Sequence, residues 1–211
     1  MNYAELTLRE FTNRLGSEDA TPGGGGASAL AGCLGAALGK MVAHLTIGRK
    51  RYAGVQDDME SLIREEEELQ REFLNLISRD AEMFAPLSRA YSMPKATPEE
   101  RKARDAVMEE ALKDACEVPL RIMEITCRSL ELAQTAAEKG SALAVSDAGD
   151  AAALCRAALQ GAALNVFINT KLMKNRILAE EYNSSTDEML EEYVPLADRI
   201  LEKVMKDLRN S

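Results

Sequence analysis

Apolar residues recur along this chain at the spacing of an α-helix, and no stretch shows the sustained alternation of a strand. Signals that begin and end helices divide the chain into six helical regions, at about 7–15, 25–47, 57–91, 98–138, 148–173 and 176–209. The clearest apolar stripe belongs to the third region and contains Leu69, Phe73, Leu76, Ile77, Phe84 and Leu87. We therefore predict an all-α fold, a bundle of about six helical regions. No linker or shift in composition marks a second domain within 1–211.

Local residue patterns predict where these helices begin. Thr7 with Glu10, and Thr97 with Glu100, have the spacing of a capping box, in which each side chain bonds the backbone N–H of the other residue. Asp147 is the expected N-cap of the fifth region, because a short carboxylate side chain accepts from the free N–H groups of the first turn.

Three further features of the sequence bear on the regularity and solvation of the predicted helices. Pro119 predicts a kink or break in the fourth region, because proline lacks the N–H that a helix interior requires. The polar run at 184–187 predicts an interruption in the sixth region. Four consecutive glutamates at 65–68 are most simply a solvated helix face.

The second region is built almost wholly of small and apolar residues. Small side chains recur every four positions, as at Gly35 and Gly39, and such ridges let another helix approach closely. A helix that is apolar all round is buried, so we expect a central helix or one shared with a second subunit. Lys40 and His44 interrupt the run, which favours a buried helix over a membrane span.

Composition narrows the classes of function. The 211 residues carry a formal net charge of −9, which excludes nucleic-acid binding as the main role because that needs a basic surface. One histidine makes a conventional zinc site improbable, so no metal site is expected. No two cysteines form a Cys-x-x-Cys pair, and we expect all four to be buried thiols in a reducing cytoplasm: Cys33, Cys116, Cys127 and Cys155.

Two motifs flank the second region. Pro22 precedes four glycines, which allow close approach of the backbone to a surface or ligand and expose N–H groups at a helix start. A basic cluster, Arg49, Lys50 and Arg51, follows the region in an otherwise acidic chain. This cluster has two interpretations of equal weight: cations at a helix C-terminus, or a site that captures an anionic ligand.

Asp80 is the strongest candidate for chemistry. It lies four residues after Leu76 and four before Phe84, within the apolar stripe, so its carboxylate faces the core or a cleft. Burial raises the pKa of a carboxyl group unless a cation or hydrogen-bond donors stabilise the charge, and general acids and bases are tuned in this way. The alternative is a structural aspartate paired with a buried cation, and position alone favours that alternative slightly.

Asn165 and Asn169 share one side of the fifth region with Gly161 and Ala162. Two amides four residues apart on a face of small side chains suit hydrogen bonding to a flat heterocycle. Interhelical hydrogen bonds that fix the register of the helix are the equal alternative.

Several stretches resemble a known family. Residues 22–25 (PGGG), 28–32 (SALAG) and 45–52 (LTIGRKRY) resemble the formiminotetrahydrofolate cyclodeaminase / methenyltetrahydrofolate cyclohydrolase family, and the likeness covers most of the chain. One position departs from the pattern: many family members have Ser where this chain has Gly26. A hydroxyl contact at that place falls to Ser28 or is absent.

The resemblance implies a site and an assembly. Asp80 matches the aspartate assigned as catalytic in the cyclodeaminase segment, and the family forms a homodimer with active sites near the subunit interface. The expected substrate-binding residues are Gly23, Gly24, Gly25, Ser28, Lys50, Asp147, Asn165 and Asn169. Lys50 is expected to meet the anionic glutamate tail of the folate. No cofactor is expected beyond the tetrahydrofolate substrate itself, and a cytoplasmic location is expected.

The resemblance implies folate one-carbon chemistry. The first interpretation is a 5-formiminotetrahydrofolate cyclodeaminase, which releases ammonia and forms 5,10-methenyltetrahydrofolate. A separate formiminotransferase, or another folate enzyme, would then supply the substrate. The alternative is a methenyltetrahydrofolate cyclohydrolase, which opens the methenyl bridge to the 10-formyl compound. A further alternative, from a different class, is a non-catalytic helical assembly module.

Overall fold

The computed structural model describes residues 2–210, and over that part of the chain it contains helices and no strand. The predicted all-α fold is confirmed. The six α-helices are α1 (Leu8–Leu15), α2 (Gly24–Thr46), α3 (Gln56–Tyr91), α4 (Pro98–Lys139), α5 (Val145–Thr170) and α6 (Arg176–Arg209). Three short 3-10 segments connect or precede them: η1 (Tyr3–Glu5), η2 (Lys50–Val55) and η3 (Ala142–Ala144).

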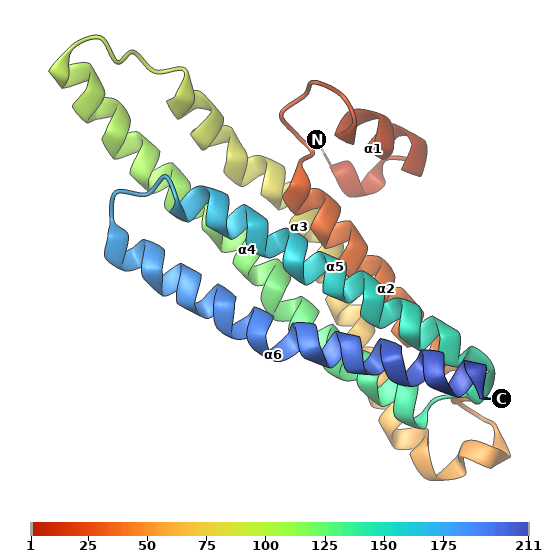
Figure 1. Ribbon diagram of the computed structural model, residues 1–211. Coiled ribbons are helices and arrows are strands. Elements are labelled where there is room, and N and C mark those ends of the chain that lie inside the picture. Colours follow the sequence, from red (N-terminus) through yellow and green to blue (C-terminus); the bar gives the residue numbers. More distant parts are fainter. Residues whose placement is uncertain (1, 211) are drawn as a thin grey trace.

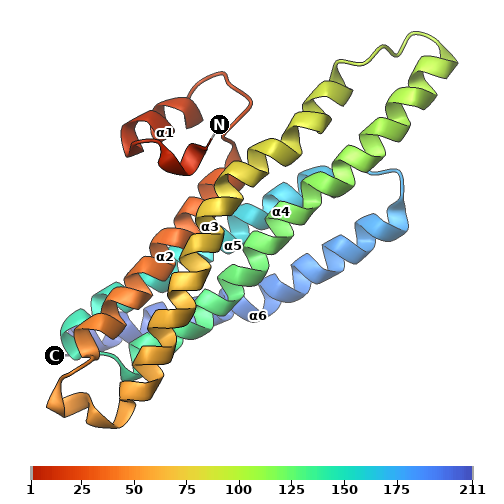
Figure 2. The same cartoon turned by 180° about the vertical axis from the view of Figure 1, so that it is seen from behind.

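The five long helices run side by side as a bundle, with α1 lying to one side near the start of α2 (Figure 1). Helix α2 packs against α3, α4 and α5, and α5 packs against α2, α4 and α6. The hairpin of α3 and α4 extends past the other helices at one end (Figure 2). Helices α2 and α5 are the least polar of the five. Helix α4 packs against all four of the other long helices, so α2 is not the single central helix of this chain.

Glycines set how closely α2 approaches its neighbours. A Cβ atom on Gly32 would lie 2.5 Å from the ring of Phe73 on α3, and one on Gly35 would overlap the sulfur of Cys155 on α5. The close helix contacts predicted from the small-residue spacing are therefore present. By length and composition, α2 and the segment 142–170 are apolar enough to span a membrane, yet a large part of each is buried within this bundle. All four cysteines are buried free thiols, as predicted.

Both capping boxes are formed, with Thr7 and Glu10 at α1 and Thr97 and Glu100 at α4. The N-cap assigned to Asp147 is wrong. Helix α5 begins at Val145, three residues before the predicted start at 148, and is continuous with η3. Asp147 therefore lies in the first turn, where the positive end of the helix dipole stabilises a carboxylate.

The predicted interruption at 184–187 is also wrong, and of the kink or break predicted at Pro119 the break is absent. Helix α4 runs unbroken through Pro119, and α6 runs unbroken through 184–187. In α6 the Thr186 hydroxyl donates to the carbonyl oxygen of Tyr182 at 2.8 Å, so a polar residue is accommodated inside the helix and buried. Packing against α5 and α4 holds α6 helical where local preference is weak.

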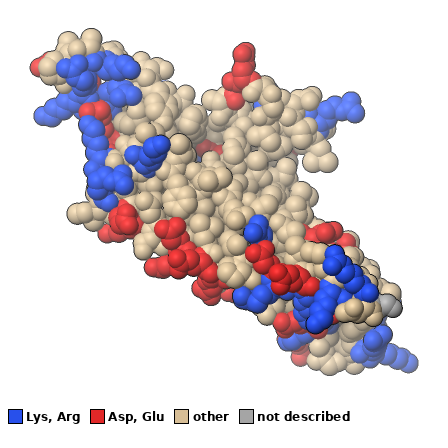
Figure 3. Space-filling view, in the orientation of Figure 1, with Lys and Arg blue, Asp and Glu red and all other residues tan. Residues whose placement is uncertain are grey.

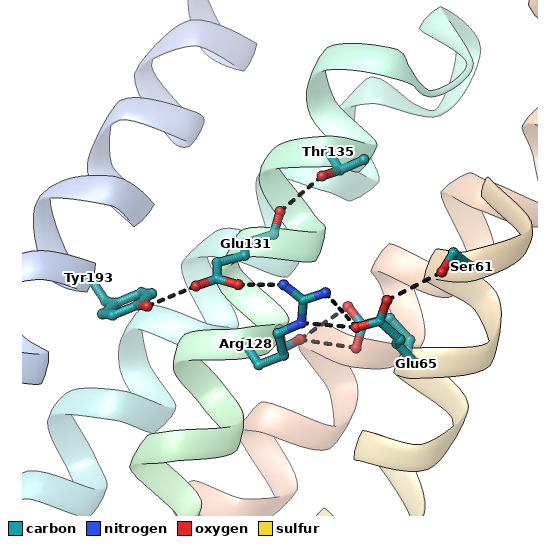
Figure 4. Close-up of polar contacts among 8 residues, drawn as sticks. Ser61, Glu65, Arg128, Glu131, Thr135 and Tyr193 are labelled. Atoms are coloured by element: carbon teal, nitrogen blue, oxygen red, sulfur yellow. Dashed lines mark hydrogen bonds and ion pairs between the residues drawn. The ribbon is translucent and has the colours of Figure 1, made fainter. Parts of the chain in front are cut away.

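The glutamate run divides between surface and core, which corrects the prediction that all four residues are solvated. Glu65 pairs with Arg128 of α4, and Arg128 also bonds Glu131, whose other oxygen accepts from the Tyr193 hydroxyl of α6 at 2.8 Å (Figure 4). This network joins α3, α4 and α6. Glu66, the next residue, is fully buried.

Candidate active site

One cavity of about 220 Å³ opens beside the first turn of α2. Its walls come from the loop before α2, from α3 and α4, and from the C-terminal half of α5. The lining residues are Ala20, Thr21, Gly23, Gly24, Asp80, Phe84, Ala115, Asn165, Ile168 and Asn169. Asp80 is the one titratable side chain among these lining residues.

The glycine run brings α2 directly against Asp80. The backbone N–H of Gly26 donates to Oδ2 of Asp80 at 3.1 Å, and a Cβ atom on Gly25 would overlap the carboxylate. The N–H of Gly26 belongs to the first turn of α2, where an N–H group has no partner within the helix. Glycine is therefore required here for close approach, and the Asp80 carboxylate occupies the start of α2.

The surroundings of Asp80 favour its neutral form. Burial raises the pKa of Asp80 to about 6, and the Gly26 hydrogen bond opposes that rise only in part. No cation lines the cavity, so the structural alternative of a buried ion pair does not apply to Asp80. A carboxyl group with a pKa near 6 exchanges protons readily at neutral pH, which is what acid–base catalysis requires.

Both predicted asparagines line the same cavity. Nδ2 of Asn165 donates to the carbonyl oxygen of Gly161 at 2.8 Å, and Nδ2 of Asn169 donates to the carbonyl oxygen of Ala115 at 3.0 Å. Each amide is thereby oriented by its nitrogen. Because no hydrogen bond of either Oδ1 is described, both oxygens are available to accept from a ligand.

The remaining glycine-run residues are placed differently. Gly23 and Gly24 line the cavity, and a Cβ atom on Gly24 would lie 3.1 Å from Nδ2 of Asn165. Ser28 does not line it. The Ser28 hydroxyl donates to the carbonyl oxygen of Gly24 at 2.8 Å, within α2, and faces Gly161 of α5. Ser28 therefore packs α2 onto α5.

Lys50 and Asp147 lie far from this cavity within one chain. Helix α2 has 23 residues and so spans roughly 35 Å, with the cavity at its first turn and Lys50 beyond its last. Asp147 precedes Asn165 by eighteen residues of α5, or roughly 27 Å. The structure therefore brings Asp80, Gly23, Gly24, Asn165 and Asn169 together but separates Lys50 and Asp147 from them.

Sequence reasoning did not assign site roles to Thr21, Phe84, Ala115 or Ile168. The place of Phe84 could have been predicted from the sequence, because Phe84 lies one helical turn from Asp80 on the same face of α3. Ala115 carried none, since its place depends on how α4 packs across α5. Among residues 2–210, no group of three His, Cys, Asp or Glu side chains is placed to hold a metal ion.

Comparison with known proteins identifies the family. Residues 7–188 match the formiminotransferase-cyclodeaminase family. A methenyltetrahydrofolate cyclohydrolase from Methylorubrum extorquens is 42% identical over 198 residues, which cover 94% of this chain and 95% of that protein. The rat formimidoyltransferase-cyclodeaminase is 33% identical over 188 residues, which are 89% of this chain but 35% of that longer protein.

A solved structure agrees with the sequence relatives. The formiminotetrahydrofolate cyclodeaminase from Thermotoga maritima superposes with a TM-score of 0.80 at 28% identity, over 95% of this chain and 98% of that one. The all-helical bundle is thus the shared fold. The chain belongs to the formiminotransferase-cyclodeaminase family, whose members named above are enzymes of folate one-carbon chemistry.

Proposed function

We propose that this chain is a 5-formiminotetrahydrofolate cyclodeaminase in which Asp80 transfers the protons. The observation that carries the proposal is an isolated carboxyl group, with a pKa near 6, in a cavity that also presents two amide oxygens. A reduced pterin ring offers N–H donors for those oxygens. The Thermotoga maritima cyclodeaminase shares the fold over nearly its whole length, which supports the same choice.

In the proposed reaction, the nitrogen at position 10 of the substrate attacks the carbon of the protonated formimino group on the nitrogen at position 5, and the imine nitrogen of that group becomes an amino group. Asp80 accepts the proton that the position-10 nitrogen loses. The resulting tetrahedral carbon then expels its amino group, and Asp80 returns the proton so that ammonia leaves. One carboxyl group near its pKa serves both steps, and the cavity keeps the two nitrogens in register.

The second candidate is methenyltetrahydrofolate cyclohydrolase, and the 42% identity to the Methylorubrum extorquens enzyme favours it. Here Asp80 would accept a proton from water as the water attacks the methenyl carbon. The bond to the position-5 nitrogen then breaks and that nitrogen takes the proton from Asp80, while the new hydroxyl group releases its own proton to solvent and becomes the formyl C=O. Both reactions pass through a tetrahedral carbon between two nitrogens, so the same cavity suits either.

Two absorbance assays separate these candidates. Offered 5-formiminotetrahydrofolate, a cyclodeaminase produces the methenyl chromophore; offered 5,10-methenyltetrahydrofolate, a cyclohydrolase removes it. The third alternative, a non-catalytic assembly module, is tested by thermal unfolding with and without tetrahydrofolate. Binding to the native state raises the midpoint, so an unchanged midpoint together with no turnover in either assay would establish the assembly module.

We also propose that the chain forms a homodimer through the exposed face of α2 and α5. Figure 3 shows a broad tract without charged side chains over these helices. Large apolar side chains of α2 and α5 are exposed: Leu34, Met41, Leu45, Leu164 and Ile168. Unpaired apolar surface of this extent is typical of a protein–protein interface.

A two-fold axis across the middle of this face would place the Lys50 end of one chain near the cavity of the other. That arrangement is the proposed route by which Lys50 meets the glutamate tail. Lys50→Ala should then raise KM most for long tails and at low salt, because exposed charge pairs are screened over roughly 10 Å. If Lys50→Ala instead lowered kcat by the same factor at every tail length and salt concentration, Lys50 would not be the residue that binds the glutamate tail.

A further inference from the structure

Pro119 leaves a gap in the hydrogen bonding of α4. In a regular helix, each N–H donates to the carbonyl oxygen four residues earlier. Proline has no N–H, and its ring pushes that carbonyl outwards. The carbonyl freed by Pro119 is that of Ala115, which lines the cavity.

Asn169 of α5 takes the place of the missing donor. Its Nδ2 lies 3.0 Å from the carbonyl oxygen of Ala115. Because a carbonyl oxygen only accepts, this bond fixes which end of the amide faces α4. Oδ1 of Asn169 is thereby held as an acceptor, beside the similarly oriented Asn165.

We propose that Pro119 is a positioning residue for substrate binding: by removing one N–H from α4, it creates the carbonyl that locks Asn169 in its ligand-accepting orientation. The identity of the ligand rests on the proposed function, whereas the locking of Asn169 does not. A proline inside a 42-residue helix destabilises that helix. Here the carbonyl that the proline leaves without a helix donor accepts from Asn169 and so orients that side chain.

Pro119→Ala tests the proposal. The restored N–H donates to the Ala115 carbonyl, and Asn169 loses its anchor. We expect KM to rise about twofold to tenfold, the effect of one hydrogen bond, with kcat and the pH profile set by Asp80 unchanged. A fully structural role for Pro119 would instead alter stability and leave KM alone.

The matched control is Pro195→Ala. Pro195 also lies inside a long helix, α6, but the carbonyl four residues earlier belongs to exposed Glu191, for which no side-chain donor is described. This variant should leave KM unchanged. Asn169→Asp is a second variant that does not depend on altering α4. Aspartate keeps an acceptor for substrate but cannot donate to Ala115, so KM should rise for it as well.

A readout without turnover separates this proposal from the proposed function. In NMR spectra the Asn169 side-chain N–H protons, assigned by their loss in Asn169→Ala, should exchange slowly in the native chain and faster in Pro119→Ala. If neither folate reacts with the native chain but this exchange difference appears, the proposed function fails and the locking stands. Unchanged KM with unchanged Asn169 protection in Pro119→Ala would overturn the proposal, as would normal KM in Asn169→Asp.

Discussion

Glu66 makes the stability of this protein depend on pH in a way that a single substitution should remove. The side chain is fully buried among α2, α3, α4 and α5, where Ser129 lies 3.2 Å from both carboxylate oxygens. The pKa of Glu66 is raised from 4.5 to about 8. Burial is the largest cause and the nearby charge of Glu65 adds to it, while Ser129, Arg128 and Lys40 oppose the rise. Glu66 is therefore neutral in the folded state at pH 7.

The difference between the folded-state and unfolded-state pKa of Glu66 sets the sign and size of its pH-dependent contribution to the free energy of unfolding. Below pH 4.5 the carboxyl is protonated in both states, and its contribution to folding is fully present. As pH rises from 4.5 to 8 the unfolded chain ionises while the folded chain does not, so stability falls; above pH 8 both ionise and the loss is complete. A difference of 3.5 pKa units corresponds to about 5 kcal/mol in total, against a typical free energy of unfolding of roughly 5–15 kcal/mol.

Glu66→Gln removes this ionisation and keeps the side chain's shape. We expect the difference in unfolding free energy between the variant and the native chain to grow by about 2.5 kcal/mol between pH 5 and 7, and to level off above pH 8. Urea unfolding followed by circular dichroism at constant ionic strength measures it. Glu67→Gln, at the exposed neighbouring position, should show no such slope. A difference for Glu66→Gln that is constant across this range would refute the reasoning.

Four further predictions concern the site and the assembly. Asp80→Asn should stay folded and lower turnover about a hundredfold or more, since the amide cannot accept the proton; near-normal turnover would remove Asp80 from the mechanism. Gly25→Ala should lower kcat strongly while circular dichroism stays helical, because its methyl group displaces the Asp80 carboxylate. Phe84→Ala should admit water and shift the kcat/KM midpoint below pH 6, whereas an unmoved midpoint would show that Phe84 does not desolvate Asp80. Leu34→Glu should convert a dimer to monomers in light scattering, and a monomeric native chain would refute the proposed interface.

Local chemistry was enough to predict most of the fold. Some signals act over only a few residues and can be recognised in the sequence itself. They include the capping boxes at Thr7 and Thr97 and the small-residue spacing around Gly35. The apolar stripe of α3 likewise placed Asp80 on the inner face, because helical periodicity fixes which residues share a side. The six helices and the inward position of Asp80 followed from such signals, whereas the catalytic role expected of Asp80 came from the family resemblance.

Tertiary packing decided what those signals left open. The position of Asp80 alone slightly favoured pairing with a buried cation. Only the packing of α2 on α3 showed that the backbone N–H of Gly26 donates to the carboxylate instead. Glu66 is indistinguishable from its exposed neighbours until α4 and α5 cover it. The sequence signals a helix break at Pro119, but the carbonyl that Pro119 frees is satisfied by Asn169, fifty residues away. Such long-range partners depend on how helices pack, and packing has no local sequence signature.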